Sequence, residues 1–124
     1  MKYSIITLLL LALLSSFTVS SELNNGDDPA DCLDELDVPK RFTPNGDEEN
    51  DIFSIPFPCD PQTFEIEIFD RFDAQLFVSK DFKFAWTGND LKGNPCQNDV
   101  YNWKIRYMYQ MNYVEVSGQV LLLR

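Results

Sequence analysis

The chain has 124 residues, a formal net charge of −10 and no histidine. The excess of acid argues against binding to nucleic acid or to an anionic membrane surface. The lack of histidine excludes Ser-His and Cys-His catalysis and most zinc chemistry.

The N-terminal segment predicts export. Lys2 is followed by an apolar run from Ile5 to Leu14, broken only by Thr7, and several serines come after it. Such a run is typical of a secretory signal peptide, and it is too short to span a bilayer, which needs about 20 residues. We expect residues 1–21 to be removed, with no stable membrane insertion afterwards. The mature chain would then reach the cell surface or the medium.

Residues 22–37 are mostly acidic and polar, with few candidates for a core. This composition predicts a flexible leader. The remaining residues, 38–124, have the length of a single domain.

The segment 42–53, FTPNGDEENDIF, combines turn-forming residues with four acids. One hypothesis is a calcium site, because oxygen ligands at every second position resemble part of a calcium loop. The candidate ligands are Asn45, Asp47, Glu49 and Asp51. Asn50, however, stands where an EF-hand loop has glycine, and no glutamate follows at the required spacing. The residues favour a tight turn in which Asn45-Gly46 permits positive φ, although a turn and a bound ion are compatible.

Several short runs rich in β-branched and aromatic residues follow, at 52–57, 64–69, 75–79, 82–86, 100–109 and 113–124. Turn residues separate them, and no helical period is sustained. The pattern predicts an all-β fold: an immunoglobulin-like or fibronectin-like antiparallel β-sandwich of about seven short strands. The last two runs are expected to form an antiparallel hairpin, because their connection is short.

No group of residues predicts an enzyme. Glu65 and Glu67 are two apart on a strand, so they share a face, which we interpret as the polar outer face. The aromatic residues of the last two runs (Tyr101, Trp103, Tyr107, Tyr109 and Tyr113) could stack on sugars, but at strand spacing core packing is favoured. No nucleophile is placed with a base and an orienting group.

The chain has three cysteines, and disulfides are permitted in an exported protein. Cys59 and Cys96 both fall between strand-like runs, so they are the most plausible pair. Closing that loop would contribute roughly 3–4 kcal/mol in the entropic model. Cys32 would be left in the acidic leader, either free or paired between chains.

A set of short motifs runs in order through residues 38–124. These are VP-x-x-FTPNGD-x-x-ND-x-F, I-F-x-R-aromatic, W-x-G, VY-x-aromatic-x-I-x-Y and a terminal G-x-V-x-L-x-R. The matching residues are Val38-Pro39, Phe42 to Asp47, Asn50-Asp51, Phe53, Ile68-Phe69, Arg71-Phe72, Trp86, Gly88, Val100-Tyr101, Trp103, Ile105, Tyr107, Gly118, Val120, Leu122 and Arg124. The set resembles the gliding motility-associated C-terminal domain, the type B sorting domain of the type IX secretion system of Bacteroidetes.

The resemblance implies a domain that outer-membrane secretion machinery recognises by shape and exposed residues. The implied recognition residues are Asn45, Gly46, Asp47, Asn50 and Asp51 in the loop, together with Arg71 and the final strand through Arg124. That strand is also expected to be a sheet edge able to pair with a partner. The competing hypothesis is a small secreted module that binds a glycan or a protein through the aromatic strand or through a loop that calcium stiffens.

The chain departs from the family pattern at several glycines. Glu48 replaces the second glycine of NGDG, Asp73 replaces the glycine of N-R-W-G, and Asp99 replaces the glycine of G-V-Y. Because glycine permits backbone conformations that other residues avoid, these replacements predict altered turns.

Overall fold

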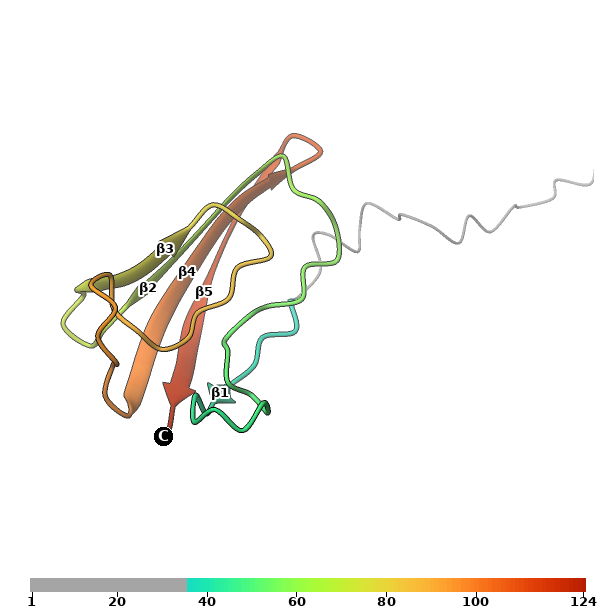
Figure 1. The fold of residues 1–124 in the computed structure, drawn as a ribbon. Helices are drawn as coiled ribbons and strands as arrows, with labels where there is room; N and C mark the ends of the chain where they lie inside the picture. Colours follow the sequence, from blue (N-terminus) through green and yellow to red (C-terminus); the bar gives the residue numbers. More distant parts are fainter. Residues whose placement is uncertain (1–35) are drawn as a thin grey trace, which may run out of the picture.

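The computed structural model describes residues 36–124, which fold around one β-sheet (Figure 1). The strands are β1 (Arg41–Phe42), β2 (Thr63–Phe69), β3 (Gln75–Ser79), β4 (Asp99–Tyr109) and β5 (Asn112–Leu122), in the order β1-β5-β4-β2-β3 across the sheet. In this part of the chain there is no helix long and apolar enough to cross a membrane. The predicted all-β class is confirmed. The predicted signal peptide and most of the predicted leader lie outside the described residues.

Alternating burial determines which face of the sheet carries the core. Ile66 and Ile68 of β2 are fully buried, and they pair with Ile105 and Trp103 of β4. This is the period of two that the sequence showed in both runs. Most of the other buried residues are aromatic, so the core is a set of packed rings.

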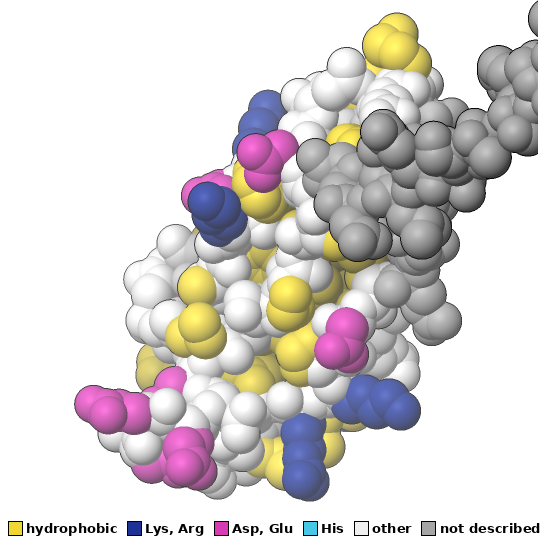
Figure 2. All heavy atoms as spheres, turned by 90° about the vertical axis from the view of Figure 1, so that its right-hand side faces the viewer, with side chains coloured by type: hydrophobic (Ala, Val, Ile, Leu, Met, Phe, Trp, Pro, Cys, Tyr) yellow, Lys and Arg dark blue, Asp and Glu magenta, His cyan; other side chains and the backbone are white. Residues whose placement is uncertain are grey.

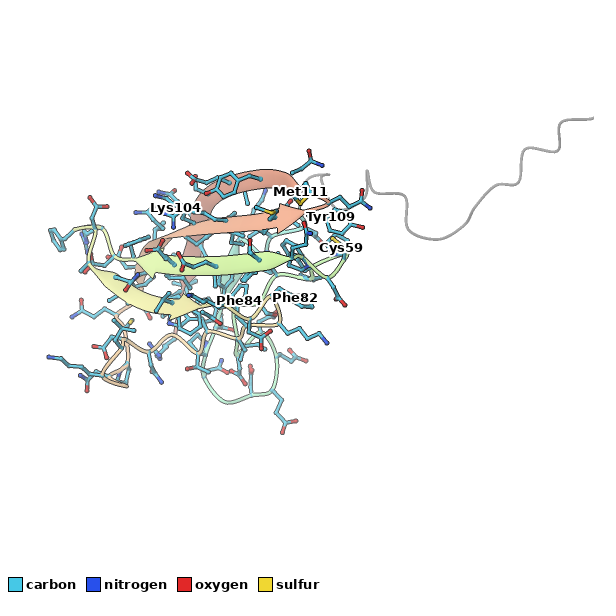
Figure 3. All side chains as sticks on the ribbon, turned by 90° about the horizontal axis from the view of Figure 1, so that it is seen from above. Cys59, Phe82, Phe84, Lys104, Tyr109 and Met111 are labelled. Carbon is cyan, nitrogen blue, oxygen red and sulfur yellow. The ribbon has the colours of Figure 1, made fainter. Side chains whose placement is uncertain are left out.

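Two long connections, residues 43–62 and 80–98, cover this face of the sheet. Figure 3 shows them gathered on one side of the strands, the side on which Phe82 and Phe84 lie. They meet at an isolated antiparallel bridge, in which Phe53 and Trp86 exchange N–H···O bonds of 2.8 and 2.9 Å. Trp86 also packs on Phe42 of β1, with ring centres 5.3 Å apart. The second layer of the core is therefore made of irregular chain.

The predicted strands at 52–57 and 82–86 are therefore wrong. Pro56 lacks the N–H that a ladder requires. In the second segment the Asp81 carboxylate accepts the N–H of Lys83 at 2.8 Å, and the Asp81 carbonyl accepts that of Phe84 at 3.1 Å. Such local bonds compete with strand pairing. With five strands in one sheet, neither the count of about seven nor the immunoglobulin-like sandwich is confirmed.

The hairpin predicted at the end of the chain is confirmed. β4 and β5 pair over their whole length and are joined by Gln110 and Met111, whose φ values are +46° and +64°. Positive φ at both loop residues is the geometry of a type I′ turn, which matches the twist of the flanking strands.

The sheet is not wholly antiparallel, because β1 runs parallel to β5. The Lys40 carbonyl accepts the N–H of Leu121 at 2.9 Å, and the Phe42 carbonyl accepts that of Leu123 at 3.2 Å. The end of β5 thus lies between β1 and β4. The prediction that this end of the final strand is a free edge is wrong.

The outer face of the sheet is polar, as predicted for Glu65 and Glu67. Arg106 of β4 donates to these two carboxylates at 3.0 and 2.9 Å, and to Glu115 of β5 at 3.2 Å. The hydrogen bond to Glu115, followed by the charge of Glu67, raises the pKa of the Arg106 guanidinium. One cation thus joins three strands on the face opposite the core.

The cysteines differ from the prediction. Cys59 is disulfide-bonded, whereas Cys96 is a half-buried free thiol. The predicted Cys59–Cys96 bond is therefore wrong. Cys32 lies outside the described residues. Sequence spacing had suggested the pair only because both cysteines fall in connections, which does not establish that the connections meet at these points.

Candidate functional site

Four segments that are far apart in the sequence meet at one end of the sheet. They are the 43–51 loop, the 70–74 turn, the 87–98 connection and Arg124, and we call their meeting place the signature end. It lies where β5 ends and β4 begins, at the bottom of Figure 1. Most of the motif residues identified in the sequence lie in these segments or directly beneath them.

The Asp51 carboxylate organises the 43–51 loop. Its Oδ1 accepts the backbone N–H groups of Asn45 and Gly46 at 2.9 and 2.8 Å, and its Oδ2 accepts that of Glu48 at 2.7 Å. These backbone donors, led by Gly46, lower the pKa of Asp51 because they stabilise the charged form. The tight turn favoured by the sequence is thus built around one carboxylate.

Positive φ recurs through the loop, at Gly46 (+80°), Glu48 (+66°) and Asn50 (+53°). Asn50 also closes the loop, since its carbonyl accepts the N–H of Thr43 at 2.7 Å. Glu48 therefore holds the left-handed conformation that the lost glycine would adopt easily, so the turn survives the replacement.

The calcium hypothesis gains no support from this geometry. Asn45 Oδ1 accepts the N–H of Asp47 at 3.0 Å, and Asp47 Oδ1 accepts that of Glu49 at 2.9 Å. With the bonds to Asp51, the candidate oxygens mostly face the backbone of their own loop. Over residues 36–124 no three acidic or cysteine side chains are grouped so as to hold a metal ion.

The W-x-G motif joins the 87–98 connection to the core and to the final strand. The Trp86 ring is buried, and its Nε1–H donates to the Asn89 carbonyl at 2.8 Å. Gly88 has φ +80°, and a Cβ at this position would lie 2.8 Å from Leu122 Cδ1 and 3.3 Å from Pro44 Cγ. Only glycine fits between the loop and β5, so this motif places two parts of the signature end against each other.

Arg124 fastens the end of the chain to the same connection. Its backbone N–H donates to Asn98 Oδ1 at 2.9 Å, and its guanidinium donates to the carbonyls of Gly88, at 3.2 Å, and Cys96. The predicted recognition residue therefore has a structural role, although its side chain remains partly exposed at the surface.

The 70–74 turn carries Arg71. Asp70 Oδ1 accepts the N–H groups of Phe72 and Ala74 at 2.8 and 2.9 Å, and Asp73 has φ +63° where the family pattern has glycine. Arg71 pairs with Asp99 at the start of β4, at 2.7 Å, and its side chain stays 63% exposed. At both positions aspartate stands where the family pattern has glycine. Asp73 is tolerated in the turn, and Asp99 is the ion-pair partner of Arg71.

A shallow depression of about 240 Å³ separates the 70–74 turn from the 87–98 connection. Arg71, Asp90, Cys96 and Tyr101 are among its lining residues. Burial raises the pKa of the Cys96 thiol. Burial also raises the pKa of the Tyr101 phenol, whose O–H donates to the Gln97 carbonyl at 2.7 Å.

A family model matches this chain over almost all of its described part. The model is that of the CHU_C Type IX secretion signal domain, and the match covers residues 36–122. The chain belongs to this family. The resemblance found in the sequence is confirmed, and the matched segment of the secretion signal domain contains all five strands. None of the curated proteins matches the chain.

The aromatic residues considered for sugar stacking belong mostly to the core of the signal domain. Tyr101, Trp103 and Tyr107 are buried on the face that the connections cover, and only Tyr113 is largely exposed. They therefore offer no continuous platform.

Sequence reasoning named the loop residues, Arg71 and Arg124, and the structure brings them to one end. It missed the parts of Asp70, Asp99 and Gly88 in assembling that end. The sequence did indicate turns at Asp70 and Gly88, because aspartate and glycine are both favoured in turns. Their partners, however, are distant in the sequence.

Proposed function

We propose that the protein is an exported polypeptide whose C-terminal domain is the address read by the type IX secretion machinery at the outer membrane. In this proposal residues 1–21 direct the chain across the inner membrane. The folded domain then docks on the outer-membrane translocon, without catalysis, and the protein is delivered to the surface or the medium of a gliding cell.

The convergence of the motif segments at the signature end carries this proposal. A stretch recognised in unfolded form would not need its parts assembled from residues 43 to 124 by buried rings and backbone bonds. Asn45, Gly46, Asp47 and Asn50 are exposed, and Asp51 holds their loop in one shape. In Figure 2 acidic side chains gather on one side of this end, and Lys and Arg side chains lie on its other side. The machinery would thus meet a rigid surface with an acidic side.

The test is a fusion in which the signal peptide, a fluorescent protein and residues 22–124 are joined in that order. We expect surface fluorescence in cells with an intact type IX translocon, and retention in the periplasm in cells without it. A fusion that reaches the surface equally in both strains would overturn the proposal.

Replacing Asn45 and Asp47 by alanine in the same fusion tests the recognition loop. Each side chain accepts only one local N–H, so the domain should stay folded while delivery falls. Alanine at Lys104, which lies on the outer face of β4, is the matched control and should leave delivery unchanged.

A further inference from the structure

The sheet has one edge strand that lacks most of the usual protection. The strand order places β1 and β3 at the two edges, and among residues 36–124 β3 pairs only with β2. β3 reads Gln-Leu-Phe-Val-Ser, with no charge and no proline. Proteins blunt exposed edges with lysine, proline, bulges or very short strands, because a free edge accepts another strand. β3 has only a register shift at its Gln75 end.

The opposite side of the sheet is better protected. Within the described part of the chain, β1 covers only Leu121 and Leu122 of β5. The uncovered part of β5 carries Glu115, which is held in the Arg106 network, and Gly118. A charge and a glycine both disfavour strand addition there.

Exposed apolar side chains lie along and beside β3. Val78 is 42% exposed on the outer face, where it pairs with Glu67 of β2. Phe72, in the turn that leads into β3, is 81% exposed, and the Arg71 guanidinium carbon lies 5.7 Å from its ring centre. Exposed aromatic and arginine side chains are enriched in protein interfaces.

The depression at the signature end continues this surface. Leu76 of β3 and Arg71 line it together with the carboxylates of Asp70, Asp90 and Asp99. The three carboxylates outnumber the positive charges of Arg71 in the lining and of Arg124, which donates to the Cys96 carbonyl beside it. A basic side chain of a partner would therefore be favoured there.

We propose that β3 accepts one extended, uncharged strand from an outer-membrane component of the export machinery, with a Lys or Arg of that component in the depression. Backbone hydrogen bonds along β3 would supply the attachment, and Phe72 would anchor it in an apolar pocket of the partner. This inference rests on the proposed function, since it names the surface by which the address is bound.

The test places a charge on the edge without touching the core. In the fluorescent fusion Val78→Lys should lower surface delivery about tenfold, because lysine on an edge disfavours strand pairing. Val78→Thr keeps the β-branched shape and should be delivered like the wild type. Tyr113→Lys puts the same charge on β5, at a side chain that is also exposed, and should have no effect.

Thermal melting of the purified proteins separates misfolding from lost docking. If Val78→Lys melts below the wild type, the Phe72→Ala variant decides between misfolding and lost docking. Phe72 is so exposed that its side chain adds little to stability. The Phe72→Ala variant should therefore stay folded, and its surface delivery should fall. Wild-type delivery that does not depend on the translocon would overturn the proposed function itself. Two results would overturn the β3 inference alone, provided that delivery depends on the translocon. One is full delivery of a folded Val78→Lys or Phe72→Ala variant. The other is loss of delivery in the Tyr113→Lys variant only.

Discussion

Gly118 is the residue at which a single methyl group should do most harm. A Cβ at this position would lie 2.6 Å from Trp103 Cζ2, within the buried ring directly across the β4–β5 ladder. Because the Trp103 side chain is buried, with only 6% exposed, Gly118→Ala should lower the free energy of unfolding by about 1–3 kcal/mol. Urea unfolding of the purified domain measures the change. Ser117→Ala, on the exposed outer face, is the control, and equal stability of both variants would contradict this account of the packing.

Asp51 makes the stability of the domain depend on pH. Its folded-state pKa is lowered from 3.8, so its contribution is complete above that pH and is lost as the pH falls through the folded-state pKa. We expect Asp51→Asn to be less stable than the wild type at pH 7, with the difference shrinking below about pH 4. Glu49→Gln removes a charge from the same loop and none of these hydrogen bonds. A difference between wild type and Asp51→Asn that does not vary with pH would contradict the role of the carboxylate.

Cys96 and Cys59 should differ in their reaction with iodoacetamide. Cys96 is a free thiol whose pKa burial raises above 9.0, so its alkylation should be slow at pH 7 and should accelerate only in strongly alkaline buffer. Cys59 is disulfide-bonded and should react only after reduction. Peptide mapping by mass spectrometry gives both rates. Alkylation of Cys59 in the unreduced protein would contradict the assignment.

At the scale of elements, the β4–β5 turn is held in a conformation that its residues do not prefer. Gln110 and Met111 both have positive φ, which Asn-Gly adopts with little strain. The double change Gln110→Asn, Met111→Gly should therefore stabilise the domain by about 1 kcal/mol. The Met111 N–H that donates to Gln62 Oε1 at 3.0 Å is kept. Met111→Val should destabilise it, because a β-branched residue is an outlier at positive φ. Thermal melting of both variants tests the turn type.

Elements with a strong local period could be predicted from the sequence. The alternation at 64–69 and 100–109 predicted β2 and β4, and the short connection predicted the hairpin. The segment at 82–86 also alternates, yet Asp81 bonds locally and only Trp86 forms a bridge. β1 was missed because two residues have no period, and its parallel pairing to β5 depends on contacts between the two ends of the domain.

The candidate site could be predicted only in part, for a similar reason. The residues of the 43–51 loop could be predicted because the Asp51 carboxylate accepts hydrogen bonds from residues only five or six positions away. Arg71 is close in sequence to Asp70 and Asp73, but its ion-pair partner is Asp99, more than twenty residues away. The Arg124 guanidinium donates to the Gly88 carbonyl only because the tertiary fold brings these two distant residues together. Local hydrogen bonds leave a trace in the sequence, whereas tertiary contacts between distant segments do not.

At the scale of the whole molecule, a core of packed rings brings four distant segments to one end of a single sheet. The ring of Phe42 in β1 packs on Phe53 of the 43–62 connection and on Trp86 of the 80–98 connection. Arg124 fastens the end of the chain to the 87–98 connection. The family match extends from residue 36 to residue 122, so it covers all of these segments except Arg124 and is not confined to one short motif. The address in this account is the assembled end of a folded domain.

The most direct measurement compares surface delivery of one fluorescent passenger, exported by the same signal peptide, with two different C-terminal extensions. One extension is residues 22–124, and the other is residues 112–124, which keeps β5 and Arg124 without the rest of the signature end. The account predicts translocon-dependent delivery with the first extension and retention in the periplasm with the second. Equal delivery by the short extension would show that the terminal strand alone is the address, and would contradict the account.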